Sequence, residues 1–120
     1  MKKDIYKRWI EKLLDPEIEQ HFGALKMENM SGKCSFCALG VLADVAGLTF
    51  TGARSGPGLI YCSAVRPGEE DQASFLPSDI LSQSLQQLVY HTNDTLRSNF
   101  KHIVTVLDGW VVDGSLILED

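Results

Sequence analysis

A nearly unbroken apolar segment, Phe-Cys-Ala-Leu-Gly-Val-Leu-Ala-Asp-Val-Ala from Phe36 to Ala46, constrains the fold of this chain most strongly. Its length and its lack of alternation favour a buried helix over a half-exposed strand. Gly47 follows the segment, and glycine is the residue most often found just after the end of a helix. We therefore expect an apolar central helix at about residues 36–46, with Asp44 at its solvent edge.

Three further helices are predicted from the spacing of apolar residues. Residues 5–14 carry an apolar stripe at helical spacing, and Pro16 should stop that helix because proline disfavours the helical conformation in the residue before it. The spacing over residues 77–89 indicates another helix. The last is expected at about residues 98–107 and should end near Gly109. The expected fold thus has about four helices, arranged around the apolar central one.

The remaining segments favour short antiparallel strands and turns. The predicted strands are residues 22–27, 48–51 and 59–65. A loop rich in glycine is expected from Gly52 to Gly58. Asp113-Gly114 suits a two-residue hairpin turn because both of its positions favour a positive φ, so a C-terminal hairpin is predicted around it. The expected fold is one α+β domain over residues 1–120.

Length, charge and cysteine content limit the class of protein. A chain of 120 residues can bury one modest core, and its 44% hydrophobic content is typical of a globular protein. The net charge of −5 argues against a nucleic-acid partner, which calls for a basic face. No stretch approaches the ~18 apolar residues of a membrane span, and the first residues do not form a signal peptide. Three cysteines, an odd number, fit a cytoplasmic location better than a secreted disulfide framework.

Several short motifs follow one another in a fixed order. They are Trp9, Gln20, Gly23, Leu25, the segment Cys37-Ala-Leu-Gly-Val-Leu-Ala-Asp44, Leu76-Pro77, Asn93-Asp94, Phe100 and Ile103. In this order they resemble the pattern of a group of small, largely uncharacterised proteins encoded by phages and prophages. The chain departs from that pattern at Thr92, where the group has an apolar residue, and in the segment from Trp110 onward.

The resemblance implies a phage or prophage setting and no known reaction. Small accessory phage proteins commonly act by binding something of the host. We therefore expect a non-enzymatic protein that binds and modulates a host macromolecule, such as a component of defence, in the host cytoplasm. No cofactor and no metal site is expected. The oligomeric state is left open, a homo-oligomer included.

An alternative from another class is a protein that sequesters a small nucleotide signal. The glycine-rich loop offers Arg54 and Ser55, and Tyr61 and Arg66 follow it. Backbone N–H groups and a guanidinium can hold a phosphate, and a tyrosine ring can stack on a base. The loop lacks the Gly-Lys-Ser/Thr ending of a P-loop, so a mobile surface loop is the simpler interpretation.

The cysteines raise a second alternative, a cysteine-dependent enzyme. Cys34 and Cys37 have the spacing of a zinc or redox pair, but too few further ligands are evident for a structural zinc site. Cys37 should lie at the start of the central helix, where a thiol can be a nucleophile, with His91 or His102 as its base. Buried structural cysteines are the favoured interpretation, because Cys37 opens an apolar segment and no acid is evidently placed to orient a histidine.

Asn93-Asp94 is a polar pair between two predicted helices. Both side chains can accept hydrogen bonds from free backbone N–H groups at a helix start. A helix-capping role is therefore favoured over a polar ligand site.

Overall fold

The computed structural model describes residues 1–56, 58–69 and 75–120, and of residues 53–55 it describes the backbone alone. Within these residues the chain has an α+β fold with four α-helices and one four-stranded antiparallel sheet. The helices are α1 (Lys3–Leu13), α2 (Ala38–Val45), α3 (Gln83–Tyr90) and α4 (Phe100–Asp113), and a π-helix, η1 (His91–Thr95), continues α3. The strands are β1 (Lys26–Glu28), β2 (Cys34–Phe36), β3 (Thr49–Ser55) and β4 (Gly58–Val65), in the order β2-β1-β4-β3. None of the helices described here is long and apolar enough to cross a membrane.

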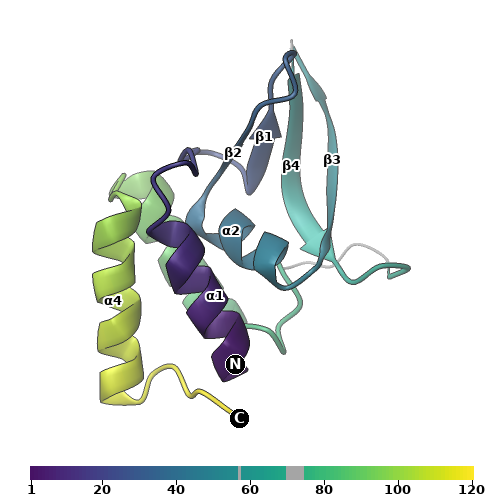
Figure 1. Ribbon diagram of the computed structural model, residues 1–120. Helices are drawn as coiled ribbons and strands as arrows, with labels where there is room; N and C mark the ends of the chain where they lie inside the picture. The colour runs from purple at the N-terminus through teal and green to yellow at the C-terminus, as the bar shows by residue number, and fades with distance from the viewer. Residues whose placement is uncertain (57, 70–74) are drawn as a thin grey trace.

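The first helix forms as its apolar stripe predicts. It buries Trp9 and Leu13, and it ends shortly before Pro16. The indole N–H of Trp9 donates to the carbonyl oxygen of Ala38 at 2.9 Å, so the centre of α1 is fixed to the first turn of α2. Figure 1 shows the resulting arrangement, in which α2 lies between α1 and the sheet and α4 runs beside α1.

The apolar segment that begins at Phe36 divides between a strand and a helix. Phe36 belongs to β2, where it pairs with Lys26 of β1. Cys37 is the N-cap residue of α2, and its sulfur accepts a hydrogen bond from the N–H of Gly40 at 3.4 Å. The first six residues of α2 are buried, and the helix contacts α1, α3, β2 and β3. The helix therefore starts two residues later than predicted.

The predicted loop from Gly52 to Gly58 is wrong. Gly52 lies inside β3, and Gly58 is the first residue of β4, while residue 57 lies outside the described residues. A glycine is needed at position 52 because a Cβ there would lie 2.2 Å from the carbonyl oxygen of Ile60 on the neighbouring strand. At position 52, glycine therefore marks the close approach of two strands rather than a turn.

The predicted C-terminal hairpin is also wrong. Helix α4 continues through Gly109 and Val111 to Asp113. Gly114 has a φ of +85° and ends this helix as its C-cap. A glycine in the left-handed conformation serves a helix end as well as a hairpin turn, so the Asp-Gly dipeptide could not distinguish the two. The last residues return to the start of the chain, where the N–H of Lys3 donates to the carbonyl oxygen of Glu119 at 2.7 Å.

Two glycines in helices, Gly40 of α2 and Gly109 of α4, provide a matched test of how tightly α2 packs against the backbone at Leu25. A Cβ at Gly40 would lie 1.8 Å from the carbonyl oxygen of Leu25, whereas a Cβ at Gly109 would meet nothing within 4 Å. Gly40→Ala should therefore prevent folding or lower the free energy of unfolding by more than about 3 kcal/mol, beyond the usual cost of overpacking. Gly109→Ala should raise it by about 0.5–1 kcal/mol, because alanine favours a helix. Urea unfolding followed by circular dichroism measures both, and a stable Gly40→Ala variant would contradict the packing of α2 described here.

Candidate functional site

A buried asparagine lies where three segments of the chain meet. Asn93 of η1 is fully buried. Its Oδ1 accepts hydrogen bonds from Nε2 of Gln20 at 2.9 Å and from the N–H of Ala38 at 3.1 Å. Its Nδ2 donates to the carbonyl oxygen of His21 at 3.0 Å and to Oδ1 of Asp94 at 2.6 Å. These four hydrogen bonds use the full capacity of a side-chain amide.

Asp94 extends this network toward the surface. Its Oδ2 accepts a hydrogen bond from the N–H of Gly23 at 2.6 Å. Nε2 of Gln20 also donates to the carbonyl oxygen of Ser98 at 2.8 Å. The pKa of Tyr90 is raised, first by burial and then by the charge and hydrogen bonding of Asp94. We call the group of Gln20, Gly23, Asn93 and Asp94 the polar junction.

The predicted capping role of the pair holds only for Asn93, and at a helix that was not foreseen, whereas Asp94 accepts the N–H of Gly23, which lies outside any helix. Asn93 accepts the N–H of Ala38, the first residue of α2, from a distant part of the chain. The start of α4 is capped by a different residue, Asn99, whose Oδ1 accepts the N–H of His102 at 2.8 Å. The polar junction therefore holds the start of α2 in place. The role of the polar junction is structural, because its polar atoms are hydrogen-bonded to one another and to the backbone.

Cys37 lies next to the junction in an environment that suppresses its reactivity. The side chain is fully buried, and burial raises its pKa to about 12, partly offset by the hydrogen bond from the N–H of Gly40. The side chains of His91 and His102, the two candidate bases, are exposed. A thiol that stays protonated at neutral pH is a poor nucleophile. This environment argues against the cysteine-dependent enzyme.

The other cysteines do not complete a ligand set within the described residues. Cys34 lies half-buried in β2, with its sulfur 3.8 Å from Oε1 of Glu28, and Cys62 is exposed on β4. All three cysteines are free thiols. Over the described ranges of the chain, no three side chains of His, Cys, Asp or Glu come together to hold a metal ion.

The residues predicted to bind a nucleotide are spread along one hairpin. Arg54 pairs with Leu59 near the turn between β3 and β4, and the side chains of Arg54 and Ser55 lie outside the described residues. Arg66 follows the other end of β4. At a rise of about 3.3 Å per residue, the Leu59 and Arg66 backbones lie roughly 20 Å apart. The structure therefore does not bring Arg66 together with the turn.

Tyr61 and Arg66 are each engaged by other side chains. Nζ of Lys26 lies over the Tyr61 ring, 5.3 Å from its centroid, and the Phe50 ring packs edge-on at 5.9 Å. The guanidinium of Arg66 forms an ion pair with Asp79 and holds the pKa of that carboxyl below its usual range. A phosphate at Arg66 would have to compete with Asp79.

An apolar hollow lies on the sheet, at the turn between β1 and β2. It has a volume of about 570 Å³, and its lining consists of His21, Met27, Asn29, Met30, Ser31, Gly58 and Ile60. Among the described residues, no lysine, arginine, aspartate or glutamate lines it. The side chain of Met30 is 84% exposed. Sequence reasoning missed this hollow because three separate segments form it, and the spacing of Met27 and Met30 was its only local signal.

Oδ1 of Asn29 and the hydroxyl of Ser31, at the rim of the hollow, are already hydrogen-bonded. Oδ1 of Asn29 accepts hydrogen bonds from the N–H of Ser31 at 3.0 Å, from Oγ of Ser31 at 2.7 Å and from the N–H of Lys33 at 3.0 Å. These bonds stabilise the turn between the two strands. What the hollow offers to a partner is therefore mainly apolar surface.

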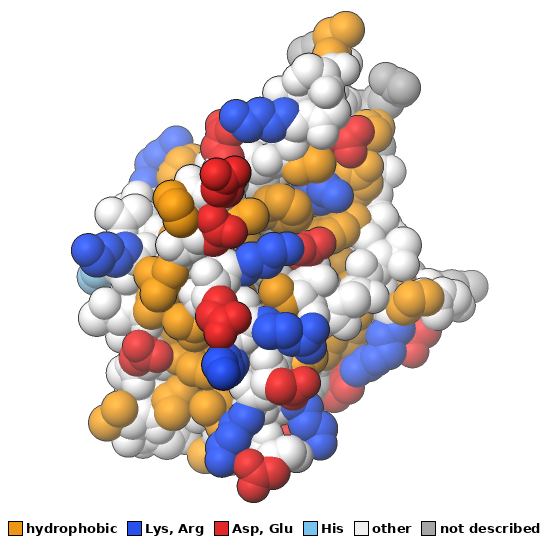
Figure 2. Space-filling model, in the orientation of Figure 1, with side chains coloured by type: hydrophobic (Ala, Val, Ile, Leu, Met, Phe, Trp, Pro, Cys, Tyr) orange, Lys and Arg blue, Asp and Glu red, His pale blue; other side chains and the backbone are white. Residues whose placement is uncertain are grey.

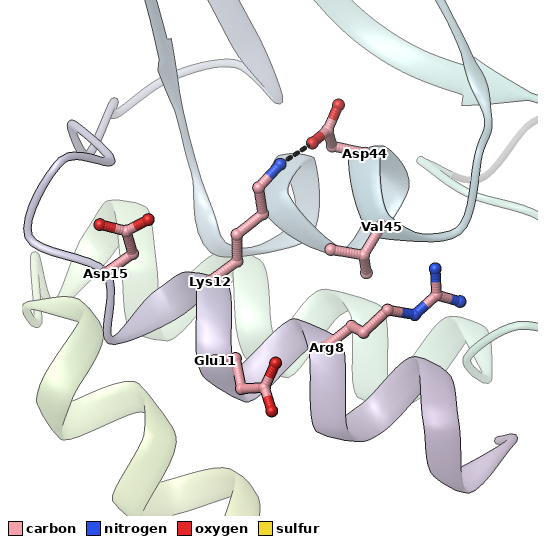
Figure 3. A pocket seen from close by; sticks show the side chains of 6 residues that line it. All are labelled: Arg8, Glu11, Lys12, Asp15, Asp44 and Val45. Carbon is pink, nitrogen blue, oxygen red and sulfur yellow. Dashed lines mark hydrogen bonds and ion pairs between the residues drawn. The ribbon is translucent and has the colours of Figure 1, made fainter.

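A second hollow, between α1 and α2, has a different character. In Figure 3, Lys12 reaches from α1 to an ion pair with Asp44 of α2, and Arg8, Glu11 and Asp15 stand around it. This groove has a volume of about 480 Å³. Figure 2 shows acidic and basic side chains mixed over this part of the molecule. Charges of both signs, with Lys12 already paired, give the groove no preference for an anion or a cation.

No family model matches this chain, and neither a curated protein nor a solved structure matches it. The resemblance to the phage and prophage group therefore stays a prediction. The function has to be inferred from the polar junction, the apolar hollow and the side chains around them.

Replacing the side-chain amide nitrogen of Asn93 by oxygen tests the hydrogen bonding of the polar junction. Asn93→Asp removes the donor to His21 and places a second carboxylate against Asp94 in a buried site, which should lower the free energy of unfolding by about 3 kcal/mol or more at pH 7. Burial and the neighbouring charge should raise the pKa of the new carboxyl above its unfolded value. The loss is therefore complete above the folded pKa and shrinks as the pH falls through it.

Asn99→Asp is the matched control, because aspartate caps a helix start as well as asparagine does. Urea unfolding of both variants and the parent chain at a series of pH values gives the comparison. A constant difference between Asn93→Asp and the parent at every pH would contradict the burial of a charge in the junction.

Thiol accessibility tests the cysteine environments. With the folded chain at pH 8, Cys62 should react first with a disulfide reagent, because it is exposed. Cys37 should react only after unfolding, because its thiol is buried and its raised pKa keeps it protonated. Mass spectrometry of the labelled peptides assigns each site. Rapid labelling of Cys37 in the folded chain would revive the thiol-enzyme alternative.

Proposed function

We propose that this chain is a phage-type accessory protein that binds and modulates a host macromolecule in the host cytoplasm, without catalysing a reaction on it. The observation that carries the proposal is the apolar hollow with Met30 exposed beside it. The order of motifs that resembles the phage and prophage group supplies the biological setting. A component of host defence is one such target.

The composition of the hollow supports a protein partner. Methionine side chains are flexible and polarizable, so they adapt to the shape of a partner and recur on binding surfaces. Met27 and Met30 contribute two such side chains, and Ile60 adds a branched apolar one. An exposed apolar concavity of this kind is typical of an interaction site.

The other two classes of function have less support. The cysteine-dependent enzyme needs a thiolate at Cys37, and burial holds that thiol protonated. The nucleotide-sequestering protein needs cations around the ligand, but Arg66 is paired with Asp79 and lies at the far end of β4 from Arg54. The described lining of the apolar hollow includes no lysine or arginine.

The docking role is tested by a double variant, Met30→Ser with Ile60→Thr. Both changes keep the strand and turn backbone and replace apolar surface by hydroxyl groups, so the fold should persist while the hollow loses its attraction for apolar side chains. Val112→Ser is the matched control, because Val112 is 88% exposed in the last turn of α4, away from the sheet.

The measurement is affinity purification from lysate of a bacterial host, with quantitative mass spectrometry. A specific partner should be enriched at least about fivefold with the parent chain and with Val112→Ser. The double variant should lose it. Recovery of the same partner by all three chains would exclude the hollow as the docking site, and the absence of any specific partner would argue against the proposal as a whole.

A further inference from the structure

An arginine without a carboxylate partner in the described part of the chain stacks on the residue that follows a lining residue of the apolar hollow. The guanidinium carbon of Arg97 lies 4.1 Å from the centroid of the Phe22 ring, so the two side chains stack. Phe22 directly follows His21, which lines the hollow. The ring on which Arg97 stacks therefore belongs to the residue next in sequence to a residue of the hollow's lining.

Arg97 differs from the other arginines whose side chains are described. Arg8 is paired with Asp4, and Arg66 is paired with Asp79. Arg97 takes part in no ion pair within the described part of the chain, although the chain carries a net charge of −5. Its nearest acidic neighbour in sequence, Asp94, is engaged by Gly23 and Asn93.

The stacked guanidinium is well prepared to bind a carboxylate. A guanidinium presents a planar fork of N–H donors that matches the two oxygens of a carboxylate, and stacking on an aromatic ring leaves the edge of that fork available. The contact with Phe22 also holds the side chain in one place, which reduces the entropy lost when a ligand binds. An anion is therefore favoured at Arg97, whereas the described lining of the hollow carries no lysine, arginine, aspartate or glutamate.

We infer that the partner presents a peptide segment whose large apolar side chains fill the hollow and whose aspartate or glutamate binds Arg97. This inference rests on the proposed function and names the chemistry of the partner. The apolar lining selects the apolar side chains, and the charge of Arg97 selects the acid. Together the two features fix the direction in which the segment lies.

The shape of the hollow favours a protein segment over a small amphipathic acid. Sites for small ligands bury most of the ligand surface. This hollow is open to solvent, and Met30 stands out into water beside it. A small molecule bound there would remain largely exposed to solvent, whereas a protein partner would cover the site with further surface of its own.

The test begins with selection from a random dodecapeptide display library on the folded chain. The enriched peptides should contain at least two large apolar residues and one aspartate or glutamate. A consensus peptide, labelled with a fluorophore, then gives dissociation constants by anisotropy. Enrichment of peptides without an acidic residue, or of none at all, would overturn the inference.

Variants of Arg97 assign the acidic contact. Arg97 has a φ of +52°, and asparagine is among the residues best tolerated there, so Arg97→Asn should fold at least as stably as the parent. Its dissociation constant should rise by about tenfold or more, a loss of about 1.4 kcal/mol. The affinity of the parent should fall with added salt, and that of Arg97→Asn should change less. Arg97→Lys should lie between the two, since it keeps the charge but loses the fork.

The outcomes separate this inference from the proposed function. If Met30→Ser with Ile60→Thr abolishes binding while Arg97→Asn leaves both affinity and salt dependence unchanged, the docking site stands and the acidic contact is wrong. If neither variant affects the affinity, the peptide binds elsewhere and both are wrong. Loss of binding in both variants, with Val112→Ser unaffected, supports the inference.

Discussion

The fold depends on one buried amide. Asn93 is fully buried and makes every hydrogen bond of which its side chain is capable, to Gln20, His21, Ala38 and Asp94. A buried polar group that loses a partner costs far more than the net gain from one hydrogen bond. Any arrangement that displaces one of these segments therefore leaves an unpaired polar atom in the core. The amide thus selects one packing of the start of α2 against η1 and the segment at residues 20–23.

Residues that carry the resemblance to the phage and prophage group surround this amide. Trp9 donates to Ala38, and Gly40 gives room for the backbone of Leu25. The N–H of Cys37 also donates to the carbonyl oxygen of Leu25 at 3.0 Å. The motif therefore describes how the start of α2 is held, which is a requirement of the fold. The residues proposed to bind a partner, those of the hollow and Arg97, lie outside the motif.

Local patterns predicted those parts of the fold that depend on local forces. The stripe of α1 and the β-prone run that became β4 follow the spacing of apolar residues. The predictions failed where one local signal serves two structures. Gly52 permits a close strand contact, and Gly114 ends a helix, although both are also turn residues.

The candidate site could be predicted to a smaller extent, because long-range contacts form it. A capping role for Asn93 follows from its chemistry, but the helix that it caps lies 55 residues away in the sequence. The hollow requires the segment at His21, the turn at Met30 and the strand at Ile60 to meet, and only the folded sheet brings them together. The stacking of Arg97 on Phe22 likewise joins residues far apart in the chain.

The polar junction also places the proposed binding surface. Asn93 donates a hydrogen bond to the carbonyl oxygen of His21, and Asp94 accepts one from the N–H of Gly23. Phe22 lies between His21 and Gly23 in the sequence, so its backbone is fixed on both sides. The π-helix that directs Asn93 inward is followed within two residues by Arg97, which stacks on that same phenylalanine from outside. A π-helical turn contains an extra residue and often lies at a functional site. Here one short segment completes the hydrogen bonding of the core on its inner side and positions a cation on its outer side, so the stability of the core and the geometry of the proposed binding surface have a common physical origin.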